Sequence, residues 1–368
     1  MGNFSQWCCR LSVLLIISLS ACIAAPEPPA LITSEAQAYI QHRVDQQQNT
    51  GIVVGIVEPG GEEFFSFGTK LINTDEPVNE DTLFEIGSIT KIFTTLLLAD
   101  MVQQGELSLD DALQEFLPAG IQAPGYKGES ITLMHLATHT SGLPLMPLNF
   151  SPEDIDNPYV DYSTEDLLDF LNSYALNRPP GQRFEYSNLG VGTLGQALVF
   201  HSRQNYADLL RKRITSRLGM PDTVLDLDAE QQARLATGHF LKRPVQHWDF
   251  DALVGAGAIR STARDLTAFL AAEVGLVETP SASAMQLTHS ALFPTDEPGV
   301  QIALGWFVRE LDGRQILYHE GGTGGFYAFV GFVPEAQMGV VILTNTQRKL
   351  DDLAFNLLDP TYPLDQEP

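Results

Sequence analysis

The feature that most constrains the fold is the placement of strand-like segments at both ends of the chain. Two candidates, joined by a Pro-Gly-Gly turn, lie near the N-terminus at 51–58 and 63–69. Four more, rich in β-branched and aromatic residues, follow one another near the C-terminus with short turns between them: 302–310, 314–319, 326–333 and 338–344. We therefore expect an α+β protein whose single antiparallel sheet is built from both termini.

The middle of the chain is mainly helical in its pattern. From Ser88 onward apolar residues recur at the spacing of one helical face, and Gly105 is a plausible helix stop. Other helical stretches lie near 33–48, 131–138, 163–175, 189–201, 204–218 and 261–273. We expect one catalytic domain over 33–368, with a sheet part at about 33–85 and 255–368 and an inserted helical part at about 86–254.

The charge balance excludes some classes of partner. The chain carries 21 Lys and Arg against 46 Asp and Glu, a formal net charge of −25. A polyanion such as nucleic acid would be repelled, and an anionic membrane surface would not attract the protein either. Any membrane association must therefore come from a specific anchor.

The first residues predict such an anchor. Arg10 precedes an apolar run at 11–19, and small residues follow before Cys22, which is the layout of an export signal too short to span a bilayer. The segment 19–22 (LSAC) resembles a bacterial lipobox, which would make residues 1–21 a signal peptide, Cys22 the lipidated residue and 22–32 a tether. The alternative is a secretory signal cut near Ala24 or Ala25. The lipoprotein interpretation predicts an exported, lipid-anchored periplasmic protein, in the outer membrane if the host has one.

A serine and a lysine open the helix that begins near residue 88. In Gly87-Ser88-Ile89-Thr90-Lys91 the two side chains are three residues apart, so they share one face of a helix. A serine hydroxyl needs a nearby base to become a nucleophile, and a lysine can be that base when its pKa is lowered. The alternative is a helix-capping serine beside a solvated lysine.

Two further motifs carry groups suited to the same chemistry. In Tyr186-Ser187-Asn188 the tyrosine can relay a proton and the asparagine can bind a substrate amide; alternatively, the tyrosine is buried and Asn188 caps the next helix. The run from His319 to Phe326 (HEGGTGGF) lies between two predicted strands, and its glycines allow backbone N–H groups to approach a ligand; alternatively, it is only a hairpin turn.

In the order SxxK, YxN, HxG, the chain resembles the serine β-lactamases of class C and the related DD-peptidases, D-aminopeptidases and esterases. Further likeness runs through 131–144, 257–266 and 304–306, so that the resemblance covers about residues 35–347. It implies a β-lactamase/transpeptidase-like fold. It also implies a set of site residues. Ser88 is the nucleophile, Lys91 and Tyr186 are the proton-handling pair, and the substrate-binding residues are Asn188, His319, Gly321 and Gly322. The N–H groups of Ser88 and Gly322 form the oxyanion hole.

One position departs from the family pattern. The family's third motif typically begins with lysine, and here His319 stands in its place, which weakens the attraction for a substrate carboxylate at neutral pH. Arg348 could supply a compensating cation or be a solvated surface residue. We therefore expect a serine hydrolase acting on D-amino-acid peptides of the cell-wall type, small esters or β-lactams. A true class C-like β-lactamase and a catalytically silent protein that binds wall peptides or a partner remain alternatives.

No metal or cofactor is expected. His135 and His139 are four residues apart and could face one way to bind zinc, but no HExxH motif accompanies them and packing roles are favoured. A GxSxG nucleophile elbow is absent, which argues against an α/β-hydrolase esterase. The expected partners are a small-molecule or peptide substrate, including peptidoglycan fragments.

Overall fold

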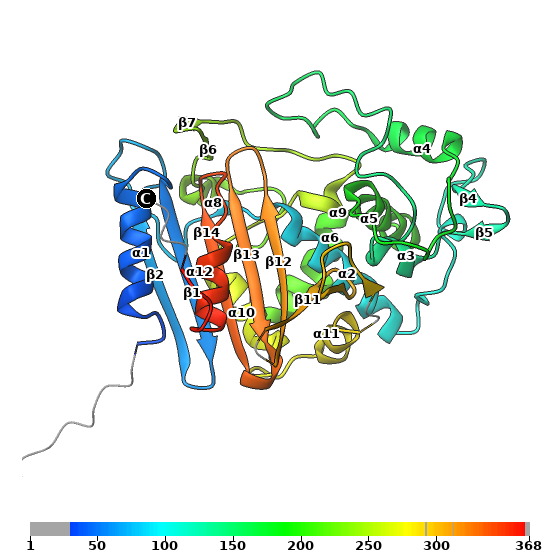
Figure 1. Cartoon of the computed structure of the whole chain (residues 1–368). Coiled ribbons are helices and arrows are strands. Elements are labelled where there is room, and N and C mark those ends of the chain that lie inside the picture. The colour runs from blue at the N-terminus through cyan, green and yellow to red at the C-terminus, as the bar shows by residue number, and fades with distance from the viewer. Residues whose placement is uncertain (1–29, 291–292, 312, 365–368) are drawn as a thin grey trace, which may run out of the picture. The chain divides into compact units, whose positions relative to one another are not determined.

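An antiparallel sheet runs through the protein (Figure 1). The computed structural model describes residues 30–290, 293–311 and 313–364, and the signal, Cys22 and most of the expected tether lie outside them. Within the described part, eight strands pair in the order β2-β1-β14-β13-β12-β11-β10-β9. They are β1 (Gly51–Glu58), β2 (Gly61–Gly68), β9 (Phe293–Pro294), β10 (Val300–Ile302), β11 (Phe307–Leu311), β12 (Arg314–Gly322), β13 (Tyr327–Val333) and β14 (Met338–Thr344). The predicted α+β class is confirmed.

The two ends of the chain meet where β1 pairs with β14, from Ile52 opposite Thr344 to Val57 opposite Gly339. Strand β1 is buried along nearly its whole length because both faces of the sheet are covered. Ile52 and its alternate neighbours pack with α1 (Ser34–Asp45) and α12 (Asp351–Leu358) on one face, while Val53 and Val57 join the larger core on the other. This explains why the strand reads as an unbroken apolar run.

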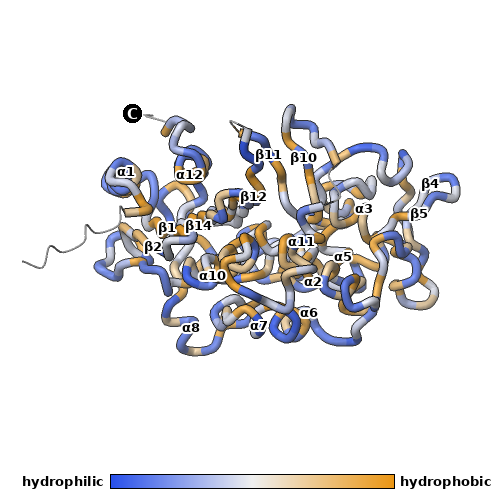
Figure 2. The backbone as a smooth tube through the Cα atoms, turned by 90° about the horizontal axis from the view of Figure 1, so that it is seen from below, coloured by the Kyte–Doolittle hydropathy of each residue, from blue (hydrophilic) through white to orange (hydrophobic). Residues whose placement is uncertain are grey.

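The larger core is built around α2 (Thr90–Gln103), whose residues from Thr90 to Met101 are all buried. In Figure 2 hydrophobic colours concentrate along the centre of the protein, where α2 and α10 (Ala263–Glu273) lie, and the hairpin of β4 (Gly125–Tyr126) and β5 (Glu129–Ser130) is hydrophilic. No helix of the described residues is long and apolar enough to cross a bilayer. The other helices are α3 (Leu133–Ala137), α4 (Thr164–Ser173), α5 (Asn188–Ser202), α6 (Tyr206–Leu210), α7 (Ser216–Leu218), α8 (Ala229–Arg234), α9 (Val254–Gly257) and α11 (Ala282–Thr288).

Short two-stranded ladders connect the loops of the helical part. They are β3 (Phe84–Glu85) with β8 (Arg260–Ser261), β4 (Gly125–Tyr126) with β5 (Glu129–Ser130), and β6 (His239–Phe240) with β7 (Arg243–Pro244). The β3–β8 pair matters most for the site because β3 ends three residues before Ser88. It ties the segment that enters the serine turn to the segment that enters α10.

The strand predicted at 302–310 is wrong as a single element. The chain turns between β10 and β11, and Gly305 adopts a left-handed φ of 82° there. A side chain at this glycine would meet Thr95 Oγ1 at 2.5 Å, and that hydroxyl donates to the Leu304 carbonyl at 2.9 Å. Close packing of this turn on α2 thus interrupts the strand. The local pattern of apolar residues does not reveal this interruption.

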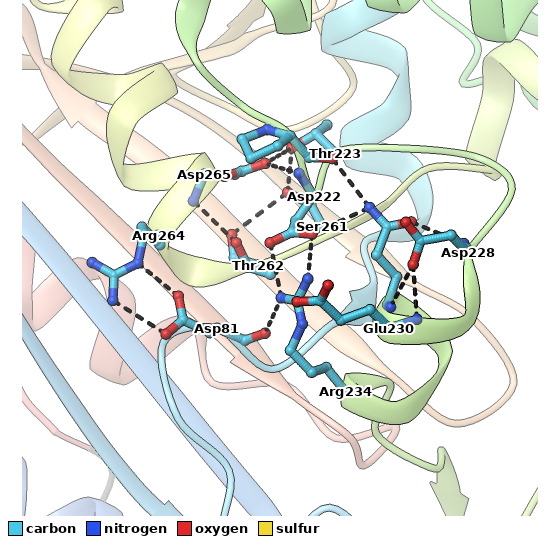
Figure 3. A network of polar contacts seen from close by, with 12 residues as sticks. Asp81, Asp222, Thr223, Asp228, Glu230, Arg234, Ser261, Thr262, Arg264 and Asp265 are labelled. Carbon is cyan, nitrogen blue, oxygen red and sulfur yellow. Dashed lines mark hydrogen bonds and ion pairs between the residues drawn. The ribbon is translucent and has the colours of Figure 1, made fainter.

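A network of buried hydrogen bonds connects Asp222 and Thr223, which precede α8, to Asp265 on α10 (Figure 3). The Asp265 carboxylate accepts from Thr223 Oγ1 at 2.9 Å and from the Asp222 N–H at 2.8 Å. The Asp222 carboxylate in turn accepts two bonds from Arg234, at 2.8 and 2.5 Å. Desolvation raises the pKa of Asp265 from 3.8 to about 6, because only 3% of this residue is exposed.

We expect the Asp265→Asn variant to change how the free energy of unfolding depends on pH. The folded protein holds the Asp265 proton more tightly than the unfolded chain, so this carboxyl contributes stability below about pH 4 that is lost as the pH rises through about 6. The loss is about 2 to 3 kcal/mol, from about 1.4 kcal/mol per pKa unit. Urea unfolding at pH 4 and pH 7 measures it. If the difference between the variant and wild type is the same at both pH values, the predicted titration is wrong.

Candidate active site

Ser88 lies in a 3₁₀ turn, Gly87–Ile89, directly before α2. The turn needs a glycine at 87, which has a left-handed φ of 50° and whose missing side chain would come within 2.6 Å of the Gly322 carbonyl oxygen. Ser88 itself keeps partial exposure to solvent. Its hydroxyl is thus presented at the start of a buried helix, and the α-helix itself begins at Thr90, two residues after the predicted start at Ser88.

Lys91 follows one turn later and is completely buried. Its Nζ donates to Ser88 Oγ at 2.9 Å and to the Ala256 carbonyl at 2.8 Å. Burial lowers the pKa of Lys91 from 10.5 to about 7, because the charged ammonium loses its hydration. Near neutral pH a large fraction of this amine is therefore uncharged and able to accept a proton from the serine hydroxyl.

Tyr186 comes from the loop before α5, and its hydroxyl forms a hydrogen bond with Ser88. Lys91 Nζ lies 5.0 Å from the centre of the tyrosine ring. Desolvation raises the pKa of Tyr186 above its usual value, although the bond with Ser88 opposes the shift. The phenol therefore keeps its proton near neutral pH, and of the two neighbours of Ser88 the lysine is the one suited to be the base.

His319 lies on β12 and is buried, with its ring 6.4 Å from that of Tyr186 and 5.2 Å from that of Phe307. Nδ1 donates to the Glu320 carbonyl at 2.6 Å, since a carbonyl can only accept. Desolvation, followed by the charge of Lys91, lowers the pKa of His319 to about 3. The imidazole is thus neutral at physiological pH, and it does not replace the positive charge of the lysine that the family pattern has here.

The glycines of β12 let this strand run against the serine turn. A Cβ at Gly321 would lie 1.9 Å from the Ile86 carbonyl oxygen and 3.2 Å from the Ser88 nitrogen. The nitrogen of Gly322 would lie 2.7 Å from a Cβ at Gly87. The backbone N–H groups of Ser88 and Gly322, predicted as oxyanion donors, therefore belong to two segments in direct contact.

We expect Gly321→Ala to lower the rate of Ser88 acylation by about 100-fold, because the new methyl group must push β12 away from the serine turn. Acylation by a fluorescent fluorophosphonate measures this. Gly60→Ala is the matched control, since its Cβ would meet only the flexible end of Glu58 at 3.2 Å. Labelling of Gly321→Ala at close to the wild-type rate would show that the close approach of the strand is not needed.

Asn188 is the first residue of α5, and Ser187 is its N-cap, with Oγ accepting from the Gly190 N–H at 2.8 Å. The alternative in which Asn188 caps this helix is wrong, because Ser187 is the N-cap. The Asn188 amide instead contacts Met146 Sδ at 3.7 Å and the Tyr159 hydroxyl. It faces the 142–162 loop beside Tyr186, and its role in substrate binding stays a prediction.

Two histidines considered as zinc ligands have separate structural contacts. His135 Nδ1 accepts from the Thr132 N–H at 3.1 Å at the start of α3. His139 is buried and its ring stacks on that of Tyr186, with centroids 4.4 Å apart. The proximity of His139 to Tyr186 could not be inferred from the sequence, because 47 residues separate them.

Aromatic residues without a recognisable motif form a wall beside the site. Trp248 lies against the glycine turn after β12, where a Cβ at Gly324 would come within 2.9 Å of its Nε1. The Tyr159 ring lies 5.3 Å from Trp248 and stacks on Phe250 at 4.4 Å. Residues of the loops at 142–162 and 239–256 therefore pack on one another beside the glycine turn.

Comparison with known proteins agrees with this geometry. The Beta-lactamase family model matches residues 36–358. A Beta-lactamase of Pseudomonas fluorescens is 27% identical over 342 residues, covering 83% of this chain and 91% of the relative. The D-alanyl-D-alanine-carboxypeptidase/endopeptidase AmpH of Escherichia coli K12 is 27% identical over 349 residues, covering 90% and 89%.

Solved structures show the same fold. A class C beta-lactamase superposes with a TM-score of 0.77 at 25% identity, covering 91% of this chain and 96% of that one. A Beta-Lactamase/D-Alanine Carboxypeptidase from Pseudomonas syringae superposes with a TM-score of 0.76 at 25% identity, covering 91% and 99%. The fold and the site together define a serine hydrolase. The chain belongs to the Beta-lactamase family.

Proposed function

We propose that the protein cleaves D-amino-acid peptides of the cell-wall type through an acyl-enzyme on Ser88. Neutral Lys91 takes the Ser88 proton as Oγ bonds to the carbonyl carbon, and the N–H groups of Ser88 and Gly322 stabilise the oxyanion. When the carbon–nitrogen bond breaks, Tyr186 protonates the leaving amine and regains its proton from Lys91. Water then attacks the ester in the reverse sequence. The observation that carries this proposal is the 2.9 Å bond between Ser88 Oγ and a buried lysine whose pKa is lowered to about 7.

The substrate class is inferred from the charged and neutral side chains near the end of β12, the strand that carries Gly322. Because His319 is neutral, it cannot attract a carboxylate. Arg348 is exposed, makes no ion pair with any described residue, and lines a pocket of about 290 Å³ together with Gly321 and Gly322. Glu320 in the same pocket pairs with Lys349 at 2.6 Å, a lysine that also contacts Asp351 at 3.2 Å, and burial together with Asp351 raises the pKa of Glu320. A peptide ending in a free carboxylate, such as the D-alanyl-D-alanine end named for the Escherichia coli relative, fits this free cation.

Hydrolysis of matched peptides tests this substrate class. The two peptides end in D-alanyl-D-alanine with a free carboxylate or with a terminal amide. Wild type should prefer the carboxylate form, and Arg348→Ala should raise the KM for that form by about tenfold while leaving the amide unchanged. Arg211→Ala, which removes an exposed arginine paired with Asp208, is the control. Equal effects of Arg348→Ala on both peptides would show that the arginine does not bind the carboxylate.

The same assay separates the alternatives. Turnover of a penicillin or a cephalosporin that exceeds peptide turnover would make the protein a class C-like β-lactamase. Preferential turnover of a small neutral ester would make it an esterase. Absence of turnover with all three substrate classes would indicate a silent binder of wall peptides.

We also propose that the protein is exported and anchored by lipid at Cys22, which lies outside the described residues. The support is the arrangement of Arg10, the apolar run at 11–19 and the segment 19–22, together with a net charge that gives the protein no affinity of its own for an anionic membrane. Mass spectrometry of the mature N-terminus should show a diacylglycerol-modified Cys22. A mature chain that begins at an unmodified alanine would refute the anchor.

A further inference from the structure

His139 contacts four successive residues around the catalytic tyrosine. Its ring stacks on Tyr186 and meets the edge of Phe184, with centroids 5.8 Å apart. Its carbonyl accepts from the Glu185 N–H at 2.8 Å, and its Nδ1 accepts from the Ser187 N–H at 3.1 Å. His139 adopts a left-handed φ of 56° in making these contacts. Such a backbone conformation is uncommon outside glycine, although asparagine, aspartate and histidine adopt it more often than other residues, and the contacts with residues 184–187 help to hold it in place.

The protonation state of His139 follows from these bonds. Because Nδ1 accepts a hydrogen bond, the proton of the neutral ring must be on Nε2. Burial, then repulsion from the ammonium of Lys91 and from His319 when that ring is protonated, keep the pKa of His139 well below 6.5. Nε2 has no hydrogen-bond partner among the described residues. The ring is therefore neutral, and it has the opposite tautomer to His319, whose proton is on Nδ1.

We propose that His139 is a positioning residue for Tyr186: its stacked, neutral ring holds the phenol against Ser88 and over Lys91. This inference rests on the proposed function of Ser88 as an acylated nucleophile. The ring limits the movement of Tyr186 on one side, where a rotation of the phenol would break its bond with Ser88 and uncover the lysine amine. A small displacement of a proton-transfer group costs much of its effect on the rate.

Two substitutions separate the stacked ring from the hydrogen bond. His139→Asn keeps an acceptor for the Ser187 N–H and a residue type that tolerates a positive φ, but it removes the ring. His139→Phe keeps a ring that can stack on Tyr186, but it removes the acceptor and is strained at this φ. The first variant should therefore lose rate more than stability, and the second should lose stability more than rate.

The measurement is the acylation rate with a fluorescent fluorophosphonate, expressed per folded molecule and compared with the Tm of each variant. His139→Asn should acylate on the order of 10-fold to 100-fold more slowly than wild type. His139→Phe should stay within about threefold of wild type with the lower Tm of the two. His135→Asn is the matched control, because His135 Nδ1 also accepts a backbone N–H at 3.1 Å but its ring does not stack on Tyr186. It should acylate like wild type.

The pH dependence gives a readout that packing alone would not move. The groups that face Lys91 are the Ser88 hydroxyl, the Ala256 carbonyl, the Tyr186 ring and the neutral imidazoles of His139 and His319. Loosening Tyr186 admits water to the lysine, which favours its charged form. In His139→Asn the acidic limb of the acylation profile should therefore move to higher pH.

The proposal is overturned if acylation rates follow Tm across the variants, or if His139→Asn keeps both the rate and the pH profile of wild type. If His139→Asn fails to fold, the acylation rate of His139→Phe decides the question. A rate near that of wild type supports positioning by the ring. A rate as low as the residual labelling of Ser88→Ala contradicts it. Wild-type protein that does not label at all would instead refute the proposed function.

Discussion

Replacing Lys91 with methionine should lower the rate of Ser88 acylation by about 10³-fold, because the only basic group bonded to the serine hydroxyl within the described residues is removed. Methionine has a similar length and no charge, so the buried site should still pack and the protein should still fold. Stopped-flow or time-resolved labelling with a fluorophosphonate measures the rate. Lys212→Met, at an exposed lysine in the turn after α6, is the matched control and should label like wild type.

The same lysine predicts the pH profile of the wild-type enzyme. Only the neutral amine can accept the Ser88 proton, and the pKa of Lys91 is about 7. Acylation should therefore be constant above about pH 8 and fall about tenfold per pH unit below about pH 6. A profile that stays flat from pH 5 to pH 9, or a Lys91→Met variant within a few-fold of wild type, would show that another group is the base.

Replacing Tyr186 with phenylalanine should lower acylation and peptide turnover by about 100-fold. The substitution keeps the ring that stacks on His139 and lies beside Lys91, and it removes only the hydroxyl that bonds to Ser88. Since burial keeps this phenol protonated, its loss should affect the step that protonates the leaving group more than the step that activates the serine. An amide substrate, whose amine leaving group needs a proton, should therefore suffer more than an activated ester.

Tyr206→Phe provides the control for this prediction. Tyr206 is another buried tyrosine. Its hydroxyl forms a 2.7 Å hydrogen bond with Thr94 Oγ1 and has no contact with Ser88 among the hydrogen bonds of the described residues. Its removal should cost about 1 kcal/mol of stability and leave kcat unchanged. If Tyr186→Phe behaves like Tyr206→Phe, with a stability loss and normal turnover, the tyrosine has no part in proton transfer.

The main elements of the sheet could be predicted because their sequence pattern has a simple physical cause. Strand β14 lies where it was expected, at 338–344, and β1 at 51–58, since strands covered on both faces are apolar at every position. Helix α1 ends at Asp45, three residues before the expected end. The predicted strand at 302–310 failed at Gly305, and the predicted helix at 204–218 is interrupted by a π-helical turn at Arg211–Thr215. The turn at Gly305 depends on its packing against Thr95, which local periodicity does not record.

The candidate site could be assembled from three motifs, and the structure brings Ser88, Lys91, Tyr186 and His319 together. The protonation states of these side chains could not be predicted from the sequence. The lowered pKa values of Lys91 and His319 come from burial, which depends on the surrounding fold and not on spacing. The stacking of His139 on Tyr186 joins segments 47 residues apart, and the wall at Trp248 is formed by a loop without a recognisable motif.

The central claim is that Ser88 becomes covalently acylated, and peptide mapping by mass spectrometry tests it most directly. The full chain is incubated with a fluorophosphonate or a penicillin and digested, and the modified peptide is sequenced. We predict one adduct, on Ser88, that disappears in Ser88→Ala and forms more slowly below pH 6. An adduct that persists in Ser88→Ala, or the absence of any adduct on the folded wild-type protein with either reagent, would contradict the account.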